Sequence, residues 1–312
     1  MKQTLQTLLT YGREQLKRRG SPEPELDAKY LLLEAFRTDM VHFLMNRSRE
    51  LPQNPEIEEM TARYRRMIAQ RGNRIPLQQI LGTQEFMGFT FYVSRHVLIP
   101  RQDTETLVEL VLKEHPGNNE AVLDLCTGSG CIALSLALMG KYRKIHAIDL
   151  SKEALKVAEK NKKQLLYGEM QEKVVFLEGD LFAALGINDS HEDDVPPVAE
   201  KAKLHEIKYD LFVSNPPYIP TKVIKTLEPE VRDFEPMTAL DGAKDGLFYY
   251  RRIASEAGNY LQPDGRMYLE IGHDQKKPVE EILAKAGYEN ICTYKDLPGR
   301  DRVVSARWPK NL

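Results

Sequence analysis

The first eighty residues place apolar side chains at helical intervals, as at Leu5, Leu8 and Leu9. Spacings of three and four residues bring such side chains to one face of a helix. Another helix is expected to start at Ser21, because serine caps helices and an apolar run follows it. The pattern predicts a small all-α domain over residues 1–81.

A further amphipathic helix is predicted within residues 54–76, where apolar positions are interleaved with arginines. Its apolar face would pack inside the helical domain, and its arginines would face water. The residues assigned to this solvated face are Arg63, Arg65, Arg66 and Arg71.

The period of the pattern changes after residue 81. Phe86, Phe89 and Phe91 stand at near two-residue spacing around Gly88. Such alternation around a turn residue is typical of a β-hairpin. We expect residues 82–96 to form a hairpin that links two domains.

From residue 120 onward, short apolar runs alternate with helical patterns, which predicts an α/β fold with a mostly parallel sheet covered by helices. The expected parallel strands lie within 121–126, 144–150, 173–180, 209–215 and 265–272. The stretch 290–308 predicts an antiparallel pair at the sheet edge. This domain would span 97–312, with the polar segment 186–208 as a surface insertion.

Charge and cysteine content narrow the classes of function. The chain has 44 lysines and arginines against 46 aspartates and glutamates, so no strong positive field would attract nucleic acid. No apolar run reaches the roughly 18 residues of a membrane span, and no signal peptide is evident. Cys126, Cys131 and Cys292 show no metal-ligand spacing. We expect a cytoplasmic protein without a metal site.

A glycine-containing loop follows the first strand of the α/β region. Gly128 and Gly130 precede small and apolar residues typical of a helix packed on a sheet. Glycine lets the backbone approach a ligand closely, and the start of a helix offers free N–H groups. With Ala133 the loop also matches the dinucleotide fingerprint, so it fits NAD as well as other nucleotide ligands.

Two aspartates favour S-adenosylmethionine over NAD. Asp149 ends the second strand, 19 residues after Gly130, where an acidic side chain takes ribose hydroxyls. Asp124 stands inside the strand before the glycines, where a carboxylate suits a cationic ligand better than a pyrophosphate. Asp149 is therefore a candidate for ribose binding, and Asp124 for supporting the loop or the methionine end of the ligand.

Another candidate follows the third strand. Asp180 could accept a hydrogen bond from an adenine amino group, with Leu181 and Phe182 against the ring. A helix cap is the competing interpretation of Asp180.

The fourth strand ends in Asn215, Pro216, Pro217 and Tyr218, at the sheet edge where α/β ligand sites open. Proline has no N–H and fixes its φ, which leaves the Pro216 carbonyl free to accept hydrogen bonds. This carbonyl and the Asn215 side-chain oxygen can accept both hydrogens of a planar NH₂ group, while the Tyr218 ring packs against the same plane. The motif predicts recognition of an amide or an aryl amine.

Such a nitrogen is a weak nucleophile, and asparagine cannot deprotonate it. Catalysis would come from holding the nitrogen in line with a sulfonium methyl group, about 3 Å away. The two oxygens would stabilise positive charge as it develops on the nitrogen. Asn215, Pro216 and Tyr218 are the expected catalytic residues.

With these motifs together, the chain resembles the HemK/PrmC family of N5-glutamine methyltransferases, which act on class I peptide chain release factors. The resemblance runs nearly end to end and includes LDAKYLLLEAF, VLDLCTGSGCIALSLA, SNPPYIP and KDLPGRDRVV. It implies a Rossmann-like class I methyltransferase domain behind a helical domain that helps to hold the release factor. The Gln of a Gly-Gly-Gln loop would enter the pocket at residues 215–218.

The resemblance also implies S-adenosyl-L-methionine as cofactor, S-adenosyl-L-homocysteine as product, and no metal. The cofactor-binding residues would be Asp124, Cys126, Thr127, Gly128, Ser129, Gly130, Asp149, Asp180, Leu181 and Asn215, and the substrate-binding residues Asn215, Pro216, Pro217 and Tyr218. Two positions depart from the family pattern. Cys126 stands where the loop usually opens with glycine, and Gln102 replaces a proline, which leaves the role of Arg101 open.

Three other functions stay open at this point. The enzyme could methylate a glutamine of a ribosomal protein, or the N6 of adenine in nucleic acid. Near-neutral charge and the lack of an evident target-recognition region count against the nucleic-acid substrate. An NAD-dependent oxidoreductase would leave the motif at 215–218 without a purpose. We expect a monomer that binds release factors, and neither nucleic acid nor membrane.

Overall fold

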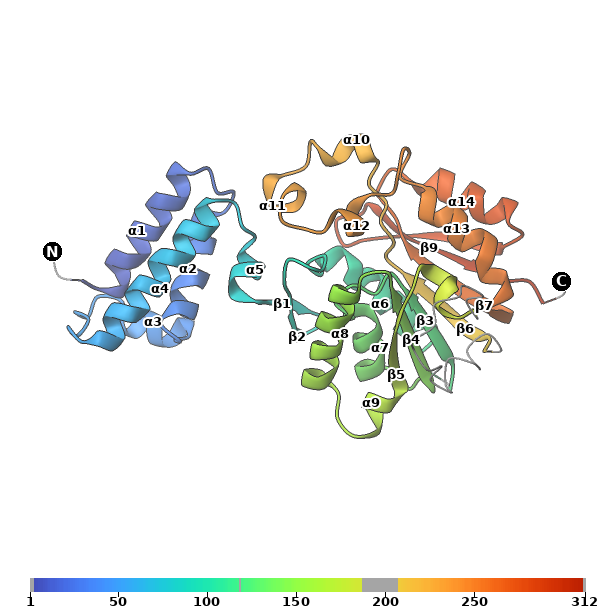
Figure 1. The fold of residues 1–312 in the computed structure, drawn as a ribbon, viewed down its shortest axis with the longest axis horizontal. Helices are drawn as coiled ribbons and strands as arrows, with labels where there is room; N and C mark the ends of the chain where they lie inside the picture. The colour runs from blue at the N-terminus through green and yellow to red at the C-terminus, as the bar shows by residue number, and fades with distance from the viewer. Residues whose placement is uncertain (1–2, 118, 187–206, 311–312) are drawn as a thin grey trace, which may run out of the picture. The chain divides into compact units, whose positions relative to one another are not determined.

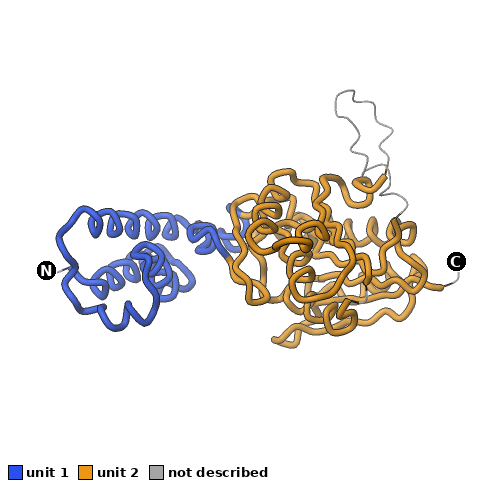
Figure 2. Tube along the Cα trace, turned by 90° about the horizontal axis from the view of Figure 1, so that it is seen from below, with its two compact units in different colours: residues 1–83, 228–234 blue, residues 84–227, 235–312 orange. Residues whose placement is uncertain are grey.

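The computed structural model describes residues 3–117, 119–186 and 207–310 of the chain. These residues form two compact units, which Figure 2 colours separately. Unit 1 comprises Met1–Thr83 together with Glu228–Phe234, and unit 2 comprises Gln84–Leu227 and Glu235–Leu312. The expected insertion at 186–208 falls almost wholly outside the described residues.

Unit 1 is helical, as the spacing of its apolar residues predicts. Its helices are α1 (Leu5–Arg18), α2 (Pro24–Ala35), α3 (Met40–Asn46), α4 (Pro55–Gly72), α5 (Leu77–Leu81) and α11 (Pro229–Arg232). Asn54 caps α4 by accepting a hydrogen bond from the Ile57 N–H, and Pro55 takes the first position of the helix. The core of the unit is fully buried at Leu16, Leu31 and Tyr64.

The predicted start of α2 at Ser21 is wrong. The helix begins at Pro24 after Glu23, and no side chain caps it. Ser21 is instead buried, and its hydroxyl donates a hydrogen bond to Asp27 Oδ2 over 2.7 Å. The serine therefore satisfies a buried carboxylate within the unit.

The prediction that the arginines of α4 lie in water is wrong for Arg71. Only 6% of its side chain is exposed, and its Nε donates to Asp27 Oδ2 over 2.7 Å. Its Nη1 donates to Glu230 Oε1 over 2.8 Å, and Arg74 Nε donates to the same oxygen over 2.7 Å. Periodicity could not reveal this burial, because Glu230 comes from the segment 228–234, far along the chain.

Unit 2 is built on the sheet that the alternating pattern predicts (Figure 1). Five strands run parallel to their neighbours, and β9 lies antiparallel between β7 and the edge strand β8. The order across the sheet is β5 (Val174–Glu178), β4 (Lys144–Asp149), β3 (Ala121–Leu125), β6 (Tyr209–Ser214), β7 (Leu261–Glu270), β9 (Asp301–Arg307) and β8 (Glu289–Lys295).

Helices cover both faces of this sheet (Figure 1). One face carries α6 (Gln102–Glu114), α7 (Cys131–Met139) and α8 (Lys152–Leu165), and the other carries α13 (Phe248–Glu256) and α14 (Lys276–Lys285). On β3, the Val122 side chain packs in the core on the face of α6 and α7. The Leu123 and Leu125 side chains pack in the core on the face of α13 and α14. A strand buried on both faces is expected to be apolar at nearly every position, and in this strand Asp124 is the one exception.

Short elements complete the fold. The strands β1 (Thr83–Phe86) and β2 (Phe89–Tyr92) form a separate two-stranded sheet at the predicted hairpin. The remaining pieces are α9 (Glu169–Lys173), η1 (Leu181–Ala184), α10 (Thr221–Ile224), α12 (Met237–Leu240) and η3 (Ala257–Asn259). Within the part of the chain that the structure describes, no helix is long and apolar enough to cross a membrane.

Candidate active site

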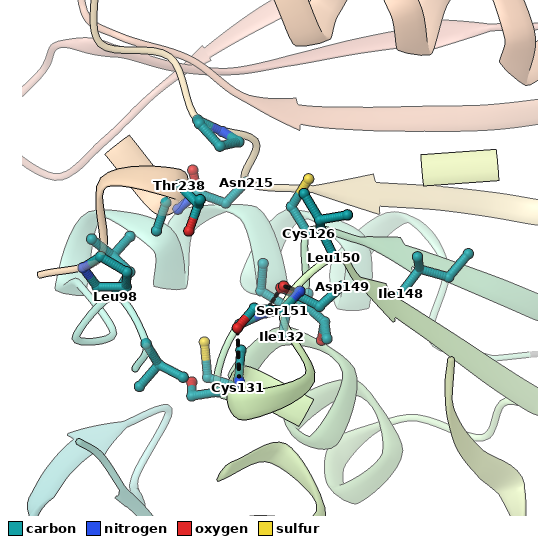
Figure 3. A pocket seen from close by; sticks show the side chains of 18 of the residues that line it. Leu98, Cys126, Cys131, Ile132, Ile148, Asp149, Leu150, Ser151, Asn215 and Thr238 are labelled. Carbon is teal, nitrogen blue, oxygen red and sulfur yellow. Dashed lines mark hydrogen bonds between the residues drawn. The ribbon is translucent and has the colours of Figure 1, made fainter. Parts of the chain in front are cut away.

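A cavity of about 350 Å³ opens at the carboxyl ends of β3, β4 and β6 (Figure 3). The strand order reverses here, because the chain runs from β3 to β4 and β5 on one side and later to β6 on the other. Open α/β sheets bind ligands at such a switch point. The cavity is lined in part by Leu98, Arg101, Thr104, Cys126, Thr127, Gly128, Ser129, Asp149, Asp180, Leu181, Asn215, Pro217, Thr238 and Tyr249.

The loop between β3 and α7 forms one wall of the cavity. It forms a turn just before α7, where the Gly130 N–H donates to the Thr127 carbonyl over 2.9 Å. A Cβ atom at Gly130 would lie only 3.0 Å from Phe176 and 3.2 Å from Ala158. This glycine therefore lets α7 pack closely on its neighbours, and it is not among the residues lining the cavity.

Asp149 projects from the end of β4 beside this loop (Figure 3). Its Oδ2 accepts from the Gly128 N–H over 2.7 Å, and its Oδ1 accepts from the Ser151 N–H over 2.8 Å. Burial raises the pKa of the carboxyl, and these two N–H groups oppose the rise. Each oxygen keeps a further lone pair, so the carboxylate can still accept hydrogen bonds from a diol.

Asp124 is fully buried behind the loop and does not line the cavity. Its Oδ2 accepts from the Thr127 hydroxyl over 2.6 Å, which ties β3 to the loop. Burial raises the pKa of Asp124 to about 7, and the Thr127 hydrogen bond opposes this rise. Of the two roles considered for Asp124, the geometry matches support of the loop.

Asp180 lines the cavity and directly precedes η1. Its side chain caps no N–H of that helix, and both of its oxygens accept from Arg252 Nη1, over 2.7 and 2.9 Å. Leu181 lines the cavity, but Phe182 does not. The expectation that Phe182 faces a ligand ring is wrong, because its ring is buried and stacks on Tyr260 with centroids 5.1 Å apart.

The motif at the end of β6 divides between the cavity and the core. Asn215 and Pro217 line the cavity, whereas Pro216 is buried beside them and Tyr218 is half-buried. Asn215 Nδ2 donates to Thr104 Oγ1 over 3.2 Å. Within the described residues, no hydrogen bond occupies the Pro216 carbonyl.

The backbone after the motif is held tightly in place. The Tyr218 carbonyl accepts from Gln275 Nε2 over 2.9 Å. A Cβ atom at Gly246 would lie only 2.3 Å from the same carbonyl oxygen, so only glycine allows this close approach. Gly246 also has a φ of 75°, which favours glycine independently.

Comparison with known proteins decides the family. A model of the PrmC N-terminal domain matches residues 7–82, and a model of a methyltransferase domain matches residues 116–294. The "Release factor glutamine methyltransferase" of Geobacter sulfurreducens is 38% identical over 304 residues, which cover 97% of this chain and 96% of that protein. This chain belongs to the release factor glutamine methyltransferases. Another member, from Clostridium botulinum, is 36% identical over 97% of this chain and 99% of its own length.

The fold of this chain also occurs outside its family. The catalytic domain of hMettl16, solved in complex with MAT2A 3'UTR hairpin 1, aligns with a TM-score of 0.53. The alignment covers 78% of this chain and 80% of that chain at 16% identity, so it shows a shared methyltransferase fold and no more.

The two positions at which this chain departs from the family pattern have local explanations. Cys126 has a φ of 61°, the left-handed region in which glycine is unstrained. Gln102 is the first residue of α6, where proline is favourable because that N–H has no helical partner. Arg101 stays anchored, since its Nη2 donates to both oxygens of the buried Glu235 over 2.7 Å.

Sequence reasoning missed three side chains of this site. Thr104 bonds Asn215, Arg252 bonds Asp180, and Asn161 of α8 joins the loop to the hairpin. Asn161 Nδ2 donates to the carbonyls of Ser129 and Tyr92, and its Oδ1 accepts from the Tyr92 N–H over 2.7 Å. Each partner is 32 or more residues away, so no local pattern signals these contacts. Across the described ranges, no cluster of three His, Cys, Asp or Glu is arranged to hold a metal ion.

Proposed function

We propose that this enzyme transfers a methyl group from S-adenosylmethionine to the side-chain amide nitrogen of the glutamine in the Gly-Gly-Gln loop of class I release factors. One observation carries the proposal: Asn215 of the amide-binding motif and Asp149 of the nucleotide-binding half line the same cavity. A methyl donor and a planar amide could therefore meet there. The names of the relatives support the choice of substrate.

The donor half of the cavity suits an adenosine-like ligand. Asp149 would accept from the ribose hydroxyls, while the backbone of Thr127, Gly128 and Ser129 would follow the ligand. Leu181 would pack against the base, and Asp180 would accept from the adenine amino group with the lone pairs that Arg252 leaves free. S-adenosylmethionine supplies, when bound, an electrophilic methyl group on a sulfonium.

Two acceptors in the other half suit an amide NH₂ group. Asn215 Oδ1 and the Pro216 carbonyl would each accept one hydrogen of the substrate nitrogen, and the face of Tyr218 would lie along the amide plane. The segment that carries both acceptors is held at its end, where Gln275 and Gly246 contact the Tyr218 carbonyl. Fixing the nitrogen in line with the methyl group can lower the barrier by several kcal/mol.

Charge stabilisation would complete catalysis. The Asn215 Oδ1 and Pro216 carbonyl oxygens would stabilise the positive charge that a methylated amide nitrogen carries. The extra proton leaves the nitrogen afterwards, and no side chain needs to act as a strong base. The N-terminal helical domain, residues 1–81, would help to hold the release factor, and the protein would work as a cytoplasmic monomer.

Mass spectrometry of a purified, unmethylated release factor tests the proposal. After incubation with this protein and S-adenosylmethionine, we expect one added methyl group on the glutamine of Gly-Gly-Gln. Asn215→Ala removes one acceptor and should lower kcat about 10²- to 10³-fold, with cofactor affinity largely kept. A release factor carrying alanine in place of that glutamine is the control. Methylation of a ribosomal protein or nucleic acid instead would redirect the assignment.

A further inference from the structure

A buried carboxylate lies behind the motif at the end of β6. Glu270 is the last residue of β7, only 1% exposed, and it does not line the cavity. Of the two polar side chains of the motif, Tyr218 hydrogen-bonds this carboxylate, and Asn215 hydrogen-bonds Thr104.

The first link is direct. The Tyr218 hydroxyl donates to Glu270 Oε1 over 3.4 Å. The Tyr250 hydroxyl donates to the backbone carbonyl of the same glutamate over 2.8 Å and fixes the end of β7. The Glu270 carboxylate therefore lies at the hydroxyl end of the Tyr218 ring.

The second link runs through Thr104, a residue of α6 that is 2% exposed. Its hydroxyl holds the pKa of the Glu270 carboxyl below the value that burial alone would give, and its Oγ1 accepts from Asn215 Nδ2 over 3.2 Å. A threonine hydroxyl has one proton. If that proton is donated to Glu270, an acceptor when ionised, Thr104 can only accept from Asn215.

We propose that Glu270 is a positioning residue that orients both side chains of the amide-binding motif, Asn215 through Thr104 and Tyr218 directly. The Asn215 NH₂ group is then turned toward Thr104, and its Oδ1 is left to accept from the substrate amide. The inference rests on the proposed function, because orientation matters only if Asn215 Oδ1 binds the substrate nitrogen.

The surroundings of Glu270 fit a group kept for orientation. Burial raises its pKa to about 7, while the Thr104 hydrogen bond and the Arg302 charge oppose the rise. Its Oε2 is buried and makes no hydrogen bond of standard geometry with the described residues. Arg302 does not neutralise it fully, since that guanidinium already pairs with Asp103 over 3.0 Å and Asp296 over 3.1 Å.

Glu270→Gln tests the proposal with nearly unchanged shape. The amide of a glutamine at position 270 can donate a hydrogen bond to the Thr104 oxygen. The Thr104 hydroxyl can then donate its proton to Asn215, which allows the Asn215 side chain to turn its Oδ1 toward Thr104 and its NH₂ group toward the substrate. We expect kcat for release factor methylation to fall about 10- to 100-fold, with KM and S-adenosylmethionine affinity changed less than about threefold. Thr104→Val should lower kcat similarly, and Thr104→Ser should restore most of it.

Glu114→Gln is the matched control. Glu114 also accepts from tyrosine hydroxyls, those of Tyr268 over 2.6 Å and Tyr294 over 2.9 Å, but it does not line the cavity. The kcat of the Glu114→Gln variant should stay within about twofold of the wild-type value. Thermal unfolding of every variant shows whether lost activity reflects lost folding.

A double-mutant cycle separates a relay from two independent effects. If Thr104 carries the influence of Glu270 to Asn215, Glu270→Gln combined with Thr104→Val lowers kcat little more than either change alone. The inference would be overturned if the double variant lost kcat by the product of the two single losses, or if both single variants kept the wild-type kcat. Either result would leave the proposed function intact. Wild-type protein that adds no methyl group to the release factor would overturn the proposed function itself.

Discussion

Asp124 shows how one buried side chain can make the stability of the protein depend on pH. Its pKa is about 7 in the folded protein and near 3.8 without burial. Between these values the folded state binds more protons than the unfolded state, so the free energy of unfolding falls as pH rises. Asp124→Asn removes this dependence. From pH 4 to pH 7, wild type should lose on the order of 4 kcal/mol relative to the variant.

Chemical denaturation at several pH values measures this difference. Glu270 also has a raised pKa, but it is present in both proteins and cancels in the comparison. Asp233→Asn is the control, because that aspartate is exposed and its pKa is lowered by Arg232. Parallel stability curves for wild type and Asp124→Asn would contradict the prediction.

Single residues differ in how far the sequence alone could place them. Asp149 and Asn215 follow apolar strands, and the carboxyl ends of parallel strands meet at one edge, so their presence at one cavity was predictable. The expectation that Phe182 faces a ligand was wrong, because an aromatic residue beside a ligand-binding residue can equally well fill the core. The Phe182 ring lies in the core and stacks on Tyr260. No local sequence pattern indicates a role for Thr104, because its hydrogen-bond partner Asn215 is 111 residues away.

Among the elements, α8 joins the hairpin to the cavity loop through Asn161. This buried amide bonds Tyr92 twice and Ser129 once. Asn161→Asp keeps the size but loses both donors and sets a carboxylate against two carbonyl oxygens. We expect a loss of unfolding free energy of about 2–4 kcal/mol. Asn161→Ala should cost about 1–3 kcal/mol.

Gln164→Ala is the control on the same helix. Gln164 is exposed and donates once to the Thr90 carbonyl over 3.2 Å, so its loss should cost under about 1 kcal/mol. Hydrogen exchange at the Tyr92 amide reports the local effect. Unchanged protection of that amide in Asn161→Asp would show that the hairpin does not depend on this contact.

The elements were more predictable than their mutual contacts. The strands of unit 2 appear where apolar β-branched runs predicted them, and the antiparallel pair takes the sheet edge. The predicted start of α2 was wrong because the Ser21 hydroxyl hydrogen-bonds the buried Asp27 carboxylate instead of capping the helix. Periodicity reports which face of an element is buried, but not which polar groups meet there.

At the scale of the whole molecule, the segment 228–234 is part of unit 1 although it lies far from it in sequence. Its Glu230 side chain is 14% exposed and accepts from Arg71 and Arg74. Glu230→Gln would leave two guanidinium groups without their shared carboxylate. We expect a loss of unfolding free energy of about 2–4 kcal/mol in unit 1, measurable as faster hydrogen exchange in α1, α2 and α4.

Glu228→Gln is a control within the same segment. Glu228 pairs with Arg74 over 3.1 Å, but its side chain is 75% exposed, and exposed pairs contribute at most about 1 kcal/mol. If Glu228→Gln and Glu230→Gln changed hydrogen exchange in unit 1 equally, the negative charge of the segment, and not the buried ion-pair network, would be what stabilises unit 1. Exchange in the β3 to β6 region serves as the internal reference for each variant.

The discontinuity of unit 1 also affects how the protein is made. Domains often fold during synthesis, the N-terminal one first. Here the helices of residues 3–83 leave the ribosome long before Glu230 is translated, and until then Arg71 is without one of its two carboxylate partners. The nascent helical unit therefore waits for most of unit 2 to be synthesised, and a fragment ending near residue 83 would lack a piece of its own structure.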